Sequence, residues 1–337
     1  MKLLIITQKV DLDDPILGFF HRWIEEFAKH YEKLTVICLQ KGEYNLPNNV
    51  KVLSLGKPAQ GWSASGGEKL FDKLRAVFKF YKYIWQERKN YDAIFVHMNQ
   101  EYVLLGGLFW FLLGKKVFMW RNHHAGNFLT DISAMFCDKV FCTSRFSYTA
   151  KYKTTVLMPV GVDTDLFKIN DQVIKIKNSI LFLGRISPSK NVHIFIEALG
   201  ILKKKGVNFT VNIYGDALPK NAVYFERLKL RARELDLDNI LKFQAGIPNY
   251  QTPEVYTAHE LYVNLSPSGM YDKTIFEAMA CGCLSLASND NLRGQIDERL
   301  VINKREAEEV KECLAKVLSL PAEEKKKMIQ GEMVFAN

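Results

Sequence analysis

Short runs of apolar, β-branched residues alternate along the chain with longer segments in which apolar residues recur at helical spacing. In the first half, this spacing predicts helices at about 18–30, 69–89 and 101–113. The apolar runs of the same half predict strands at 3–7, 34–39, 50–55, 93–97, 116–120, 139–143 and 155–157. Alternation of this kind is typical of βαβ units that build a parallel sheet.

The pattern pauses over residues 160–178, which end in a polar run, and then starts again. Helices of the second series are expected at about 191–205, 224–235, 274–280 and 307–318. Strands of this series are expected at 179–184, 209–214, 240–243, 261–265 and 284–287, with a further short candidate at 300–302. The second half therefore predicts another parallel sheet with its own helices.

A chain of 337 residues exceeds the usual size of one domain. We expect an α/β protein of two doubly wound, Rossmann-like domains, spanning 1–168 and 179–320. Residues 321–337 would form a tail that could return toward the first domain. Ligands of such sheets bind at the carboxyl ends of the strands, so two facing domains would place a reaction in the cleft between them.

The composition, 48% apolar and 25% charged, is that of an ordinary globular protein. No apolar segment reaches the roughly 18–20 residues that a membrane span needs. The chain opens with Met-Lys-Leu-Leu-Ile-Ile-Thr, which fits a first strand and lacks the longer apolar run of a signal peptide. We therefore expect a cytoplasmic protein.

Cysteine and histidine spacing gives no sign of a metal site. The six cysteines are scattered and include no Cys-x-x-Cys, and the seven histidines lack the i, i+4 spacing of a metal-binding pair. Ordinary reduced thiols and a site without metal are the expectation.

Net charge is +9, and it is unevenly placed. Residues 1–168 carry 23 Lys and Arg against 16 Asp and Glu, whereas residues 169–337 carry 23 against 21. A basic surface attracts nucleic acid, anionic lipid or phosphorylated substrates, and net charge alone does not choose among them.

The first segment that suggests chemistry is residues 184–191, Gly-Arg-Ile-Ser-Pro-Ser-Lys-Asn, between an apolar strand and an amphipathic helix. Gly184 permits a tight exit from the strand. Arg185 offers a planar fork of donors and Lys190 a point charge, a pair suited to a diphosphate. The helix that follows adds unpaired N–H groups and its positive end. The alternative, for the segment taken alone, is a solvated basic turn.

The second such segment is residues 266–282, which read Ser-Pro-Ser-Gly-Met-Tyr-Asp-Lys-Thr-Ile-Phe-Glu-Ala-Met-Ala-Cys-Gly. The carboxylate of Glu277, near the start of a helix that follows a strand, is placed to accept hydrogen bonds from ribose hydroxyls. Free N–H groups of the loop could meet a phosphate. The alternative is a helix cap with a glycine-terminated turn.

In spacing and order, these two segments resemble glycosyltransferase family 4. Residues 160–167, Val-Gly-Val-Asp-Thr-Asp-Leu-Phe, are similar to that family's interdomain pattern, and residues 213–216 and 243–248 are similar to two further family segments. The resemblance covers nearly the whole chain. It implies the GT-B fold of two facing Rossmann-like domains and a retaining transfer from a nucleotide-sugar, with no cofactor and no metal required. The donor's own phosphate would assist the incoming hydroxyl.

The resemblance also implies roles for residues of the second domain. Arg185 and Lys190 would bind the donor diphosphate, and Glu277 would bind the ribose. The backbone of Gly246, Ile247 and Pro248 would contact the base. Further donor contacts are expected from Gly269, Lys273 and Thr274, in the loop and first helical turn before Glu277.

One position departs from the family pattern, which has a second Glu eight residues before Glu277. That position is Gly269, and the loop that contains it is shorter than usual. The missing carboxylate normally touches the donor sugar. Asp272, as a catalytic candidate, or Lys273 could take over part of its role, so the identity of the transferred sugar is the least constrained feature.

In the first domain, Gly18 precedes a helix where the family has a glycine-rich loop near donor phosphate and acceptor. Residues 120–124, Trp-Arg-Asn-His-His, end a strand, and His123 resembles the family's cleft histidine that contacts donor sugar or acceptor. His124 is its main rival, His97 is similarly placed, and a structural histidine is the alternative. No Gly-x-Gly-x-x-Gly follows the first strand, which argues against a nicotinamide enzyme.

The predicted helix over 69–89 carries seven basic and two acidic residues. Its apolar residues recur at helical spacing: Leu70, Leu74, Val77, Phe78, Tyr81, Ile84 and Trp85. The stripe could pack on the sheet with the basic residues in solvent, or it could rest on anionic lipid near a membrane-bound acceptor.

Together these features predict transfer of a hexosyl unit from a UDP- or GDP-sugar to a glycan or lipid-linked acceptor, as in cell-surface polysaccharide or glycolipid synthesis. The protein would lie in the cytoplasm, with the inner membrane face as a second place of action. Gly269 motivates an alternative: an inactive subunit that binds sugar-nucleotide within a glycan-assembly complex. Nucleic acid is not an expected partner, because no aromatic–basic RNA motif or helix-turn-helix signature is present.

Overall fold

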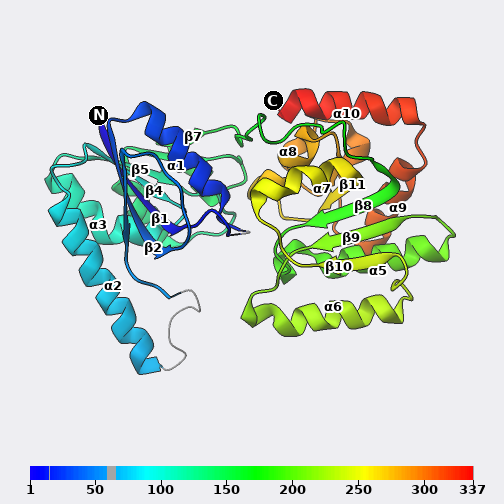
Figure 1. Ribbon diagram of the computed structural model, residues 1–337, viewed down its shortest axis with the longest axis horizontal. Helices are drawn as coiled ribbons and strands as arrows, with labels where there is room; N and C mark the ends of the chain where they lie inside the picture. Colours follow the sequence, from blue (N-terminus) through cyan, green and yellow to red (C-terminus); the bar gives the residue numbers. More distant parts are fainter. Residues whose placement is uncertain (15, 59–65, 337) are drawn as a thin grey trace. The chain divides into compact units, whose positions relative to one another are not determined.

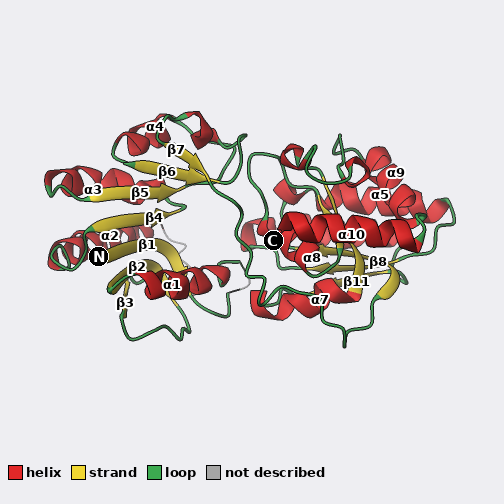
Figure 2. Cartoon of the chain, turned by 90° about the horizontal axis from the view of Figure 1, so that it is seen from above, coloured by secondary structure: helices red, strands yellow, loops and turns green. Residues whose placement is uncertain are grey.

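The computed structural model describes residues 1–14, 16–58 and 66–336, with the side chains of 66–69 excepted. Contacts divide the chain into two compact units, Met1–Met158 and Pro159–Asn337 (Figure 1). Each unit is a parallel sheet with helices on both faces (Figure 2). Within the described ranges, no helix is both long and apolar enough to cross a bilayer.

The N-terminal unit has a seven-stranded parallel sheet in the order β3-β2-β1-β4-β5-β6-β7. Its strands are β1 (Lys2–Val10), β2 (Lys33–Lys41), β3 (Val50–Ser54), β4 (Ala93–His97), β5 (Lys116–Trp120), β6 (Lys139–Cys142) and β7 (Thr155–Leu157). Its helices are α1 (Phe19–His30), α2 (Gly66–Gln86), α3 (Gln100–Leu112) and α4 (Phe128–Met135). All seven predicted strands of this half are confirmed.

Strand β1 shows why this sheet is buried on both faces. Side chains alternate between the faces of a strand. Leu4 and Ile6 pack in the cluster that α2, α3 and α4 cover, whereas Leu3 and Ile5 pack in the cluster that α1 covers. The continuous apolar run of β1 follows from this arrangement, as expected for a parallel sheet with helices on both sides.

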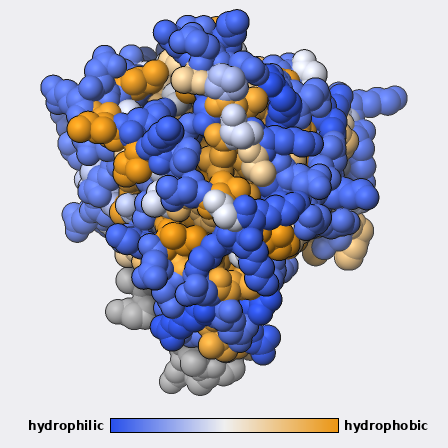
Figure 3. Space-filling model, turned by 90° about the vertical axis from the view of Figure 1, so that its right-hand side faces the viewer, coloured by the Kyte–Doolittle hydropathy of each residue, from blue (hydrophilic) through white to orange (hydrophobic). Residues whose placement is uncertain are grey.

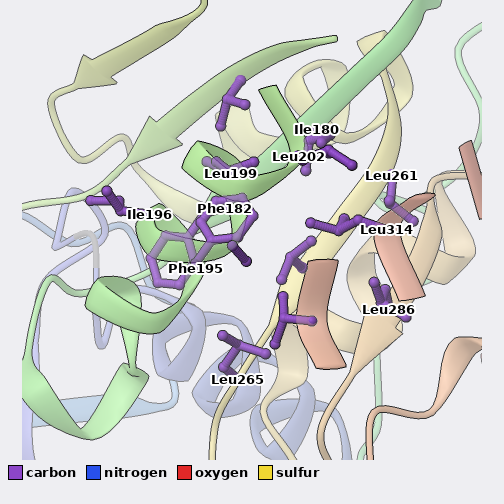
Figure 4. Packing of buried hydrophobic residues seen from close by; sticks show 14 of the residues in the cluster. Ile180, Phe182, Phe195, Ile196, Leu199, Leu202, Leu261, Leu265, Leu286 and Leu314 are labelled. Carbon is purple, nitrogen blue, oxygen red and sulfur yellow. The ribbon is translucent and has the colours of Figure 1, made fainter. Parts of the chain in front are cut away.

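The C-terminal unit has a five-stranded parallel sheet in the order β10-β9-β8-β11-β12. Its strands are β8 (Ile176–Leu183), β9 (Thr210–Tyr214), β10 (Leu241–Gln244), β11 (His259–Asn264) and β12 (Leu284–Ala287). Its helices are α5 (Val192–Lys204), α6 (Ala222–Glu234), α7 (Thr252–Ala258), α8 (Lys273–Ala280), α9 (Ala307–Leu318) and α10 (Ala322–Ala336). On one face, Phe182 of β8 packs against Phe195 of α5 (Figure 4).

The division between the units falls after Met158, earlier than the predicted end of the first domain at residue 168. Val160 and Phe167 are buried in the cluster that contains Tyr256 of α7. The segment predicted to close the first domain is therefore part of the core of the second.

The predicted tail, 321–337, is largely the helix α10. This helix packs against α8 and β12, and Phe335 contacts Phe276 of α8. It is thus a layer of the C-terminal unit. At the predicted strand 300–302, only an isolated bridge between Val301 and Ala287 forms.

Helix α10 covers the edge of the sheet with a buried carboxyl. Glu332 is 2% exposed, and both its oxygens accept from the backbone N–H of Ser285 in the edge strand β12. Burial raises the pKa of Glu332, the N–H of Ser285 opposes the change, and the charge of Asp297 adds to it. A carboxyl whose pKa is higher in the folded state stabilises the fold below its unfolded pKa, and that contribution is lost as pH rises.

We expect Glu332→Gln to raise the melting temperature at pH 8 by about 2–4 °C, which corresponds to about 1 kcal/mol in a unit of this size. The gain should shrink toward pH 5, because protonating the wild-type carboxyl on folding costs less free energy as pH approaches its unfolded pKa. Thermal melts at both pH values measure this, with the exposed Glu323→Gln on the same helix as control. A variant less stable than wild type at pH 8 would show that the carboxylate is ionised in the fold.

Candidate functional site

The C-terminal sheet changes winding direction between β8 and β11. The chain runs from β8 outward to β9 and β10, and then returns to place β11 on the other side of β8. The carboxyl ends of two such strands diverge into a crevice where α/β proteins bind ligands. The segments after β8 and β11 are those that the sequence singled out.

Lys190 and the start of α5 lie at this point. A short 3-10 helix, Pro188–Lys190, leads into Asn191, which has the left-handed backbone conformation, φ 54°. The side chain of Asn191 donates to the carbonyl of Leu265, just past β11, at 2.8 Å. The loop after β8 is thereby fastened to the loop after β11, and strain of this kind is common in binding sites.

A partly buried ion pair joins the two loops. Lys190 Nζ lies 2.5 Å from Asp272 Oδ2 and donates to Ser266 Oγ at 3.0 Å. The side chains of Lys190 and Asp272 are 21% and 12% exposed. The same carboxylate oxygen accepts from Ser266 Oγ and, at 3.0 Å, from Asn264 Nδ2. Burial opposes ionisation of Asp272, but these partners outweigh it and hold the pKa of Asp272 below its usual value.

A second set of hydrogen bonds positions the Lys190–Asp272 pair through Asn264. Tyr262 donates its hydroxyl to Thr274 Oγ1 at 2.7 Å, and Asn264 Nδ2 lies 3.0 Å from the same Tyr262 oxygen. Thr274, predicted to contact the donor, therefore accepts a hydrogen bond inside the network. These contacts position Asn264 and, through it, Asp272.

Asp272 was expected to stand in for the missing sugar-contacting carboxylate. Its Oδ2 is saturated by Lys190, Ser266 and Asn264. Within the described residues, its Oδ1 accepts no hydrogen bond. The structure thus gives Asp272 a defined role toward Lys190 and leaves one oxygen for a ligand hydroxyl.

Glu277 lies one turn further along α8, 2% exposed. Its Oε1 accepts from Asn249 Nδ2 at 3.1 Å, and its Oε2 accepts from Tyr256 at 3.3 Å. Burial raises the pKa of Glu277, although the nearby charge of Lys273 and both hydrogen bonds act against the change. Burial lowers the pKa of Lys273, and the negative charges of Glu277 and Asp163 act against that change. The two side chains are four residues apart on one helix and face each other.

The loop that contains Gly269 is held by the loop after β12. Asn291 Nδ2 donates to the carbonyl of Ser268 at 2.8 Å, and Asn289 Nδ2 donates to the carbonyl of Met270 at 2.9 Å. Gly269 is buried in the turn between them. The loop is therefore shaped by contacts of its backbone, and the position that usually supplies a carboxylate supplies only main chain.

Arg185 is exposed at the end of β8, and its guanidinium has no hydrogen-bond or ion-pair partner among the described residues. The backbone beside it is tightly packed. A Cβ on Gly215, at φ 152°, would lie 1.9 Å from the carbonyl oxygen of Gly184, so only glycine fits there. The ends of β8 and β9 thus approach each other closely, and Arg185 extends from a rigid turn.

Gly246, Ile247 and Pro248 form the loop after β10, as predicted. A Cβ on Gly246 would lie 2.6 Å from Asp216 Oδ2, so the loop after β9 contacts this one. Asn249, the next residue, donates to Glu277, which places the loop beside the predicted ribose-binding carboxyl.

In the N-terminal unit, His123 lies in the loop after β5 and stacks on His124, with ring centroids 4.4 Å apart. Its Nδ1 lies 2.9 Å from the backbone nitrogen and 3.2 Å from the carbonyl oxygen of Ala125, so it can accept from the N–H, with the ring proton on Nε2, or donate to the carbonyl. Burial lowers the pKa of His123, the hydrogen bond to Ala125 opposes the change, and the positive charges of a protonated His124 and of Arg121 add to it. A neutral imidazole with a free Nε2–H can donate to a substrate hydroxyl.

Gly18 caps the start of α1. A Cβ at this position would lie 2.5 Å from the carbonyl oxygen of Asp14 and 2.8 Å from that of Leu12, so the turn itself requires glycine. The structure therefore accounts for Gly18 without a ligand.

The winding reversal of the N-terminal sheet lies between β1 and β4. His97, a weaker candidate than His123 for the cleft histidine, ends β4. Thr7 Oγ1 and His97 Nδ1 lie 3.1 Å apart, and Gln8 Nε2 donates to Asn99 Oδ1 at 2.7 Å. Met98, between His97 and Asn99 just after β4, has φ 69°. His97 is 1% exposed and stacks on Phe20. Its ring supports the loop, while Gln8 and Asn99 are the polar groups nearer the surface.

Sequence reasoning missed the residues that hold the site together. Asn264 lies at the end of a strand, Tyr256 and Asn249 belong to α7 and its approach, and none of these three is part of a motif. Ser266 begins the second motif, but no role was predicted for it. In the part of the chain that the structure describes, no group of three or more His, Cys, Asp or Glu side chains is arranged to hold a metal ion.

Comparison with known proteins finds a family match and distant relatives. Residues 167–332 match the model of the family described as glycosyl transferases group 1. The chain is 24% identical to mannosylfructose-phosphate synthase of Agrobacterium fabrum over 165 residues, which covers 43% of this chain and 36% of the relative. It is 25% identical over 172 residues to the GtfA subunit of the UDP-N-acetylglucosamine–peptide N-acetylglucosaminyltransferase of Streptococcus parasanguinis, covering 49% and 32%. The chain thus spans about a third of the length of these curated relatives.

Among solved structures, the chain is similar to Anabaena Alr3699/HepE in complex with UDP and glucose. The TM-score is 0.76 at 18% identity, and the alignment covers 100% of this chain and 95% of the other. The likeness establishes the fold: two Rossmann-like parallel-sheet domains, the GT-B arrangement. The family match falls on the unit that contains Lys190, Asp272 and Glu277.

Proposed function

We propose that this chain, whose C-terminal unit carries a glycosyl transferases group 1 domain, is a retaining glycosyltransferase of family 4. It moves a hexosyl unit from a UDP- or GDP-sugar to a glycan or lipid-linked acceptor, and it needs no metal or other cofactor. The observation that carries the proposal is the partly buried Lys190–Asp272 pair at the winding reversal of the second sheet.

Lys190 provides the charge for a diphosphate. An ammonium has three donors, and Asp272 and Ser266 take two of them, so one remains for a phosphate oxygen. Arg185, exposed on the same strand end, adds a fork that matches two phosphate oxygens. The N-termini of α5 and α8 begin at these loops and favour negative charge.

Glu277 is proposed to recognise the ribose. Its two oxygens each receive one hydrogen bond from the protein, and a carboxylate can accept more. The neighbouring backbone of residues 246–248 offers groups for the base. Asp272 Oδ1 and the backbone of Gly269, together with Lys273, are then the groups proposed to contact the sugar.

In the proposed reaction, the acceptor hydroxyl attacks the anomeric carbon on the face from which the diphosphate departs. The bond from that carbon to the phosphate oxygen breaks, and the departing phosphate takes the hydroxyl proton, so charge and atoms balance and the configuration is kept. Lys190 and Arg185 stabilise the charge that gathers on the leaving phosphate. His123 is proposed to donate a hydrogen bond to a substrate hydroxyl in the N-terminal, acceptor-binding unit.

The relatives support a nucleotide-sugar donor. One similar structure holds UDP and glucose, and one curated relative is named for a UDP-N-acetylglucosamine donor. We propose synthesis of a cell-surface polysaccharide or glycolipid in the cytoplasm, at the inner face of a membrane.

Gly269 favours a second candidate, an inactive subunit that binds sugar-nucleotide within a glycan-assembly complex. A panel of UDP- and GDP-sugars, with products followed by mass spectrometry, separates the two. Hydrolysis or transfer from one donor is the expected result. Tight binding of a nucleotide-sugar without turnover would support the subunit, and absence of both would contradict the donor site itself.

A further inference from the structure

Helix α2 has two apolar faces, and only one of them packs on the sheet. Ala76, Phe80 and Ile84 are buried in the core of the N-terminal unit. The apolar stripe of the sequence analysis, for which packing on the sheet was one interpretation, combines residues of both faces. Of that stripe, Ile84 is buried, whereas Leu74 and Phe78 are exposed to solvent.

The second apolar face of α2 is exposed along several turns. Leu74 is 46% exposed, Phe78 is 74% exposed and Trp85 is 55% exposed, with Tyr81 at 42% between them. At 100° per residue, these four side chains fall within one quarter of the helix circumference. The side chain of Lys69, where the predicted helix began, lies outside the described residues.

Helix α3 extends this surface. The hydroxyl of Tyr81 donates to the carbonyl of Leu105 at 2.9 Å, and the rings of Trp85 and Phe109 lie 6.0 Å apart, so α3 runs beside the exposed face of α2. Leu108 and Leu112 follow on the same side of α3 and are 59% and 74% exposed. We define the α2–α3 patch by its six residues: Leu74, Phe78, Tyr81, Trp85, Leu108 and Leu112.

The first turns of α2 extend beyond the strands of the N-terminal sheet (Figure 1). Figure 3 shows one face of the molecule, on which hydrophilic side chains predominate and apolar areas lie between them. A contiguous apolar patch rimmed by charge marks an interaction site on a soluble domain.

Basic residues flank the patch on α2. Arg75 and Lys82 lie along the side of the helix next to the exposed apolar stripe, and both are exposed, as is Lys89 in the turn after the helix. Arg88 stacks over Trp85 at 4.1 Å from the ring centroid. Tryptophan and tyrosine beside basic side chains are the composition of helices that lie in the plane of a membrane interface.

We propose that the α2–α3 patch docks on an anionic membrane surface, with its apolar residues in the headgroup boundary and its basic rim against lipid phosphates. A second copy of the chain is the other plausible occupant, and charge disfavours it. Residues 1–158 carry 22 Lys and Arg against 14 Asp and Glu, so a symmetric contact would bring two basic rims together. Anionic lipid supplies the opposite charge.

This inference deepens the membrane location proposed above and rests on that part of it. Docking would hold the chain where a lipid-linked acceptor is concentrated. The test does not involve turnover, so failure to bind vesicles would leave glycosyl transfer standing, and failure of transfer would leave docking standing.

The test is flotation of the full chain with vesicles of phosphatidylcholine alone or with added phosphatidylglycerol. Wild type should float with the anionic vesicles and be released by salt. The Phe78→Glu and Leu112→Glu double variant should lower the apparent affinity by at least about tenfold. Both positions are exposed, so the fold should survive, and a thermal melt checks this. The matched control is Val223→Glu with Leu230→Glu on α6, at 67% and 56% exposure, and it should bind like wild type.

Charge is tested separately. Arg75→Glu with Lys82→Glu should lower affinity for anionic vesicles by about tenfold or more, whereas Lys204→Glu with Lys220→Glu in the C-terminal unit should not. Equal flotation with neutral and anionic vesicles, or retained flotation of the Phe78→Glu and Leu112→Glu variant, would overturn the proposal. A wild-type dimer in sedimentation without lipid, dispersed by that variant, would assign the patch to a second copy instead.

Discussion

Replacing Lys190 with alanine is expected to lower kcat/KM for the donor by about 10²–10³-fold. Truncating one partner of a buried charge pair costs about 2–5 kcal/mol, and here the lost group is also the proposed ligand of the diphosphate. Steady-state kinetics with the donor identified by the panel, together with calorimetric titration of the nucleoside diphosphate, measure the effect.

The variant also leaves Asp272 buried without its cation, which destabilises the fold by about 3–5 kcal/mol. Combining Lys190→Ala with Asp272→Asn removes both charges and separates the two consequences. The double variant should regain most of the lost stability and none of the donor affinity. If affinity returned with stability, Lys190 would be a structural residue and the diphosphate would bind elsewhere.

Glu277→Gln is expected to lower kcat/KM by about 10–100-fold, because hydrogen bonds to a charged group are worth about 1.5–3 kcal/mol. The loss should concern the ribose: wild type should bind UDP more tightly than 2′-deoxy- or 3′-deoxy-UDP, and the variant should bind them alike. Glu254→Gln on the exposed side of α7 is the matched control.

The pH dependence of donor binding gives a second readout of Glu277. Burial raises the pKa of this carboxyl, so wild type should lose donor affinity on acidification at a higher pH than an ordinary Glu would cause. The charged groups that act on this carboxyl are Lys273, whose own pKa is lowered by burial, and Asp272, whose pKa is held below its usual value by its partners. The Gln variant should lack this acidic limb. A wild-type profile without it would indicate that the proton on Glu277 does not matter for binding.

The strand and helix order followed from apolar periodicity because both sheets are parallel and buried on both faces. The two motifs placed Lys190 correctly after a strand and Glu277 correctly in the helix that follows another strand, since such segments combine polar residues with a glycine after an apolar run. Helices α4 and α7 were not predicted, because each is short: α4 starts at an Asn127 capping box and α7 spans seven residues.

The partners of Lys190 could not be read from the sequence. Asp272 lies 82 residues away along the chain, and Ser266 lies 76 residues away. Only the return of β11 to the side of β8 brings them together. The sequence does not show that one oxygen of Asp272 accepts hydrogen bonds from three donors. Asp272 was therefore expected, with Lys273 as the alternative, to contact the sugar.

The same limit applies to α2. Helical spacing shows that apolar residues share an arc of a helix, but it does not show which arc meets the sheet. Phe80 and Ile84 form the packed arc because Phe80 contacts Tyr102 and Trp110 of α3. Phe78 and Trp85 are then left outside, where only a partner can cover them.

A crystal structure of the protein with the nucleoside diphosphate of its donor would show directly whether Lys190 and Arg185 bind the diphosphate. We predict a phosphate oxygen within about 2.7–3.0 Å of Lys190 Nζ, a second phosphate contact from Arg185, and hydrogen bonds from the ribose hydroxyls to Glu277. A diphosphate bound out of reach of both Lys190 and Arg185, with Lys190 still engaged only by Asp272 and Ser266, would contradict it.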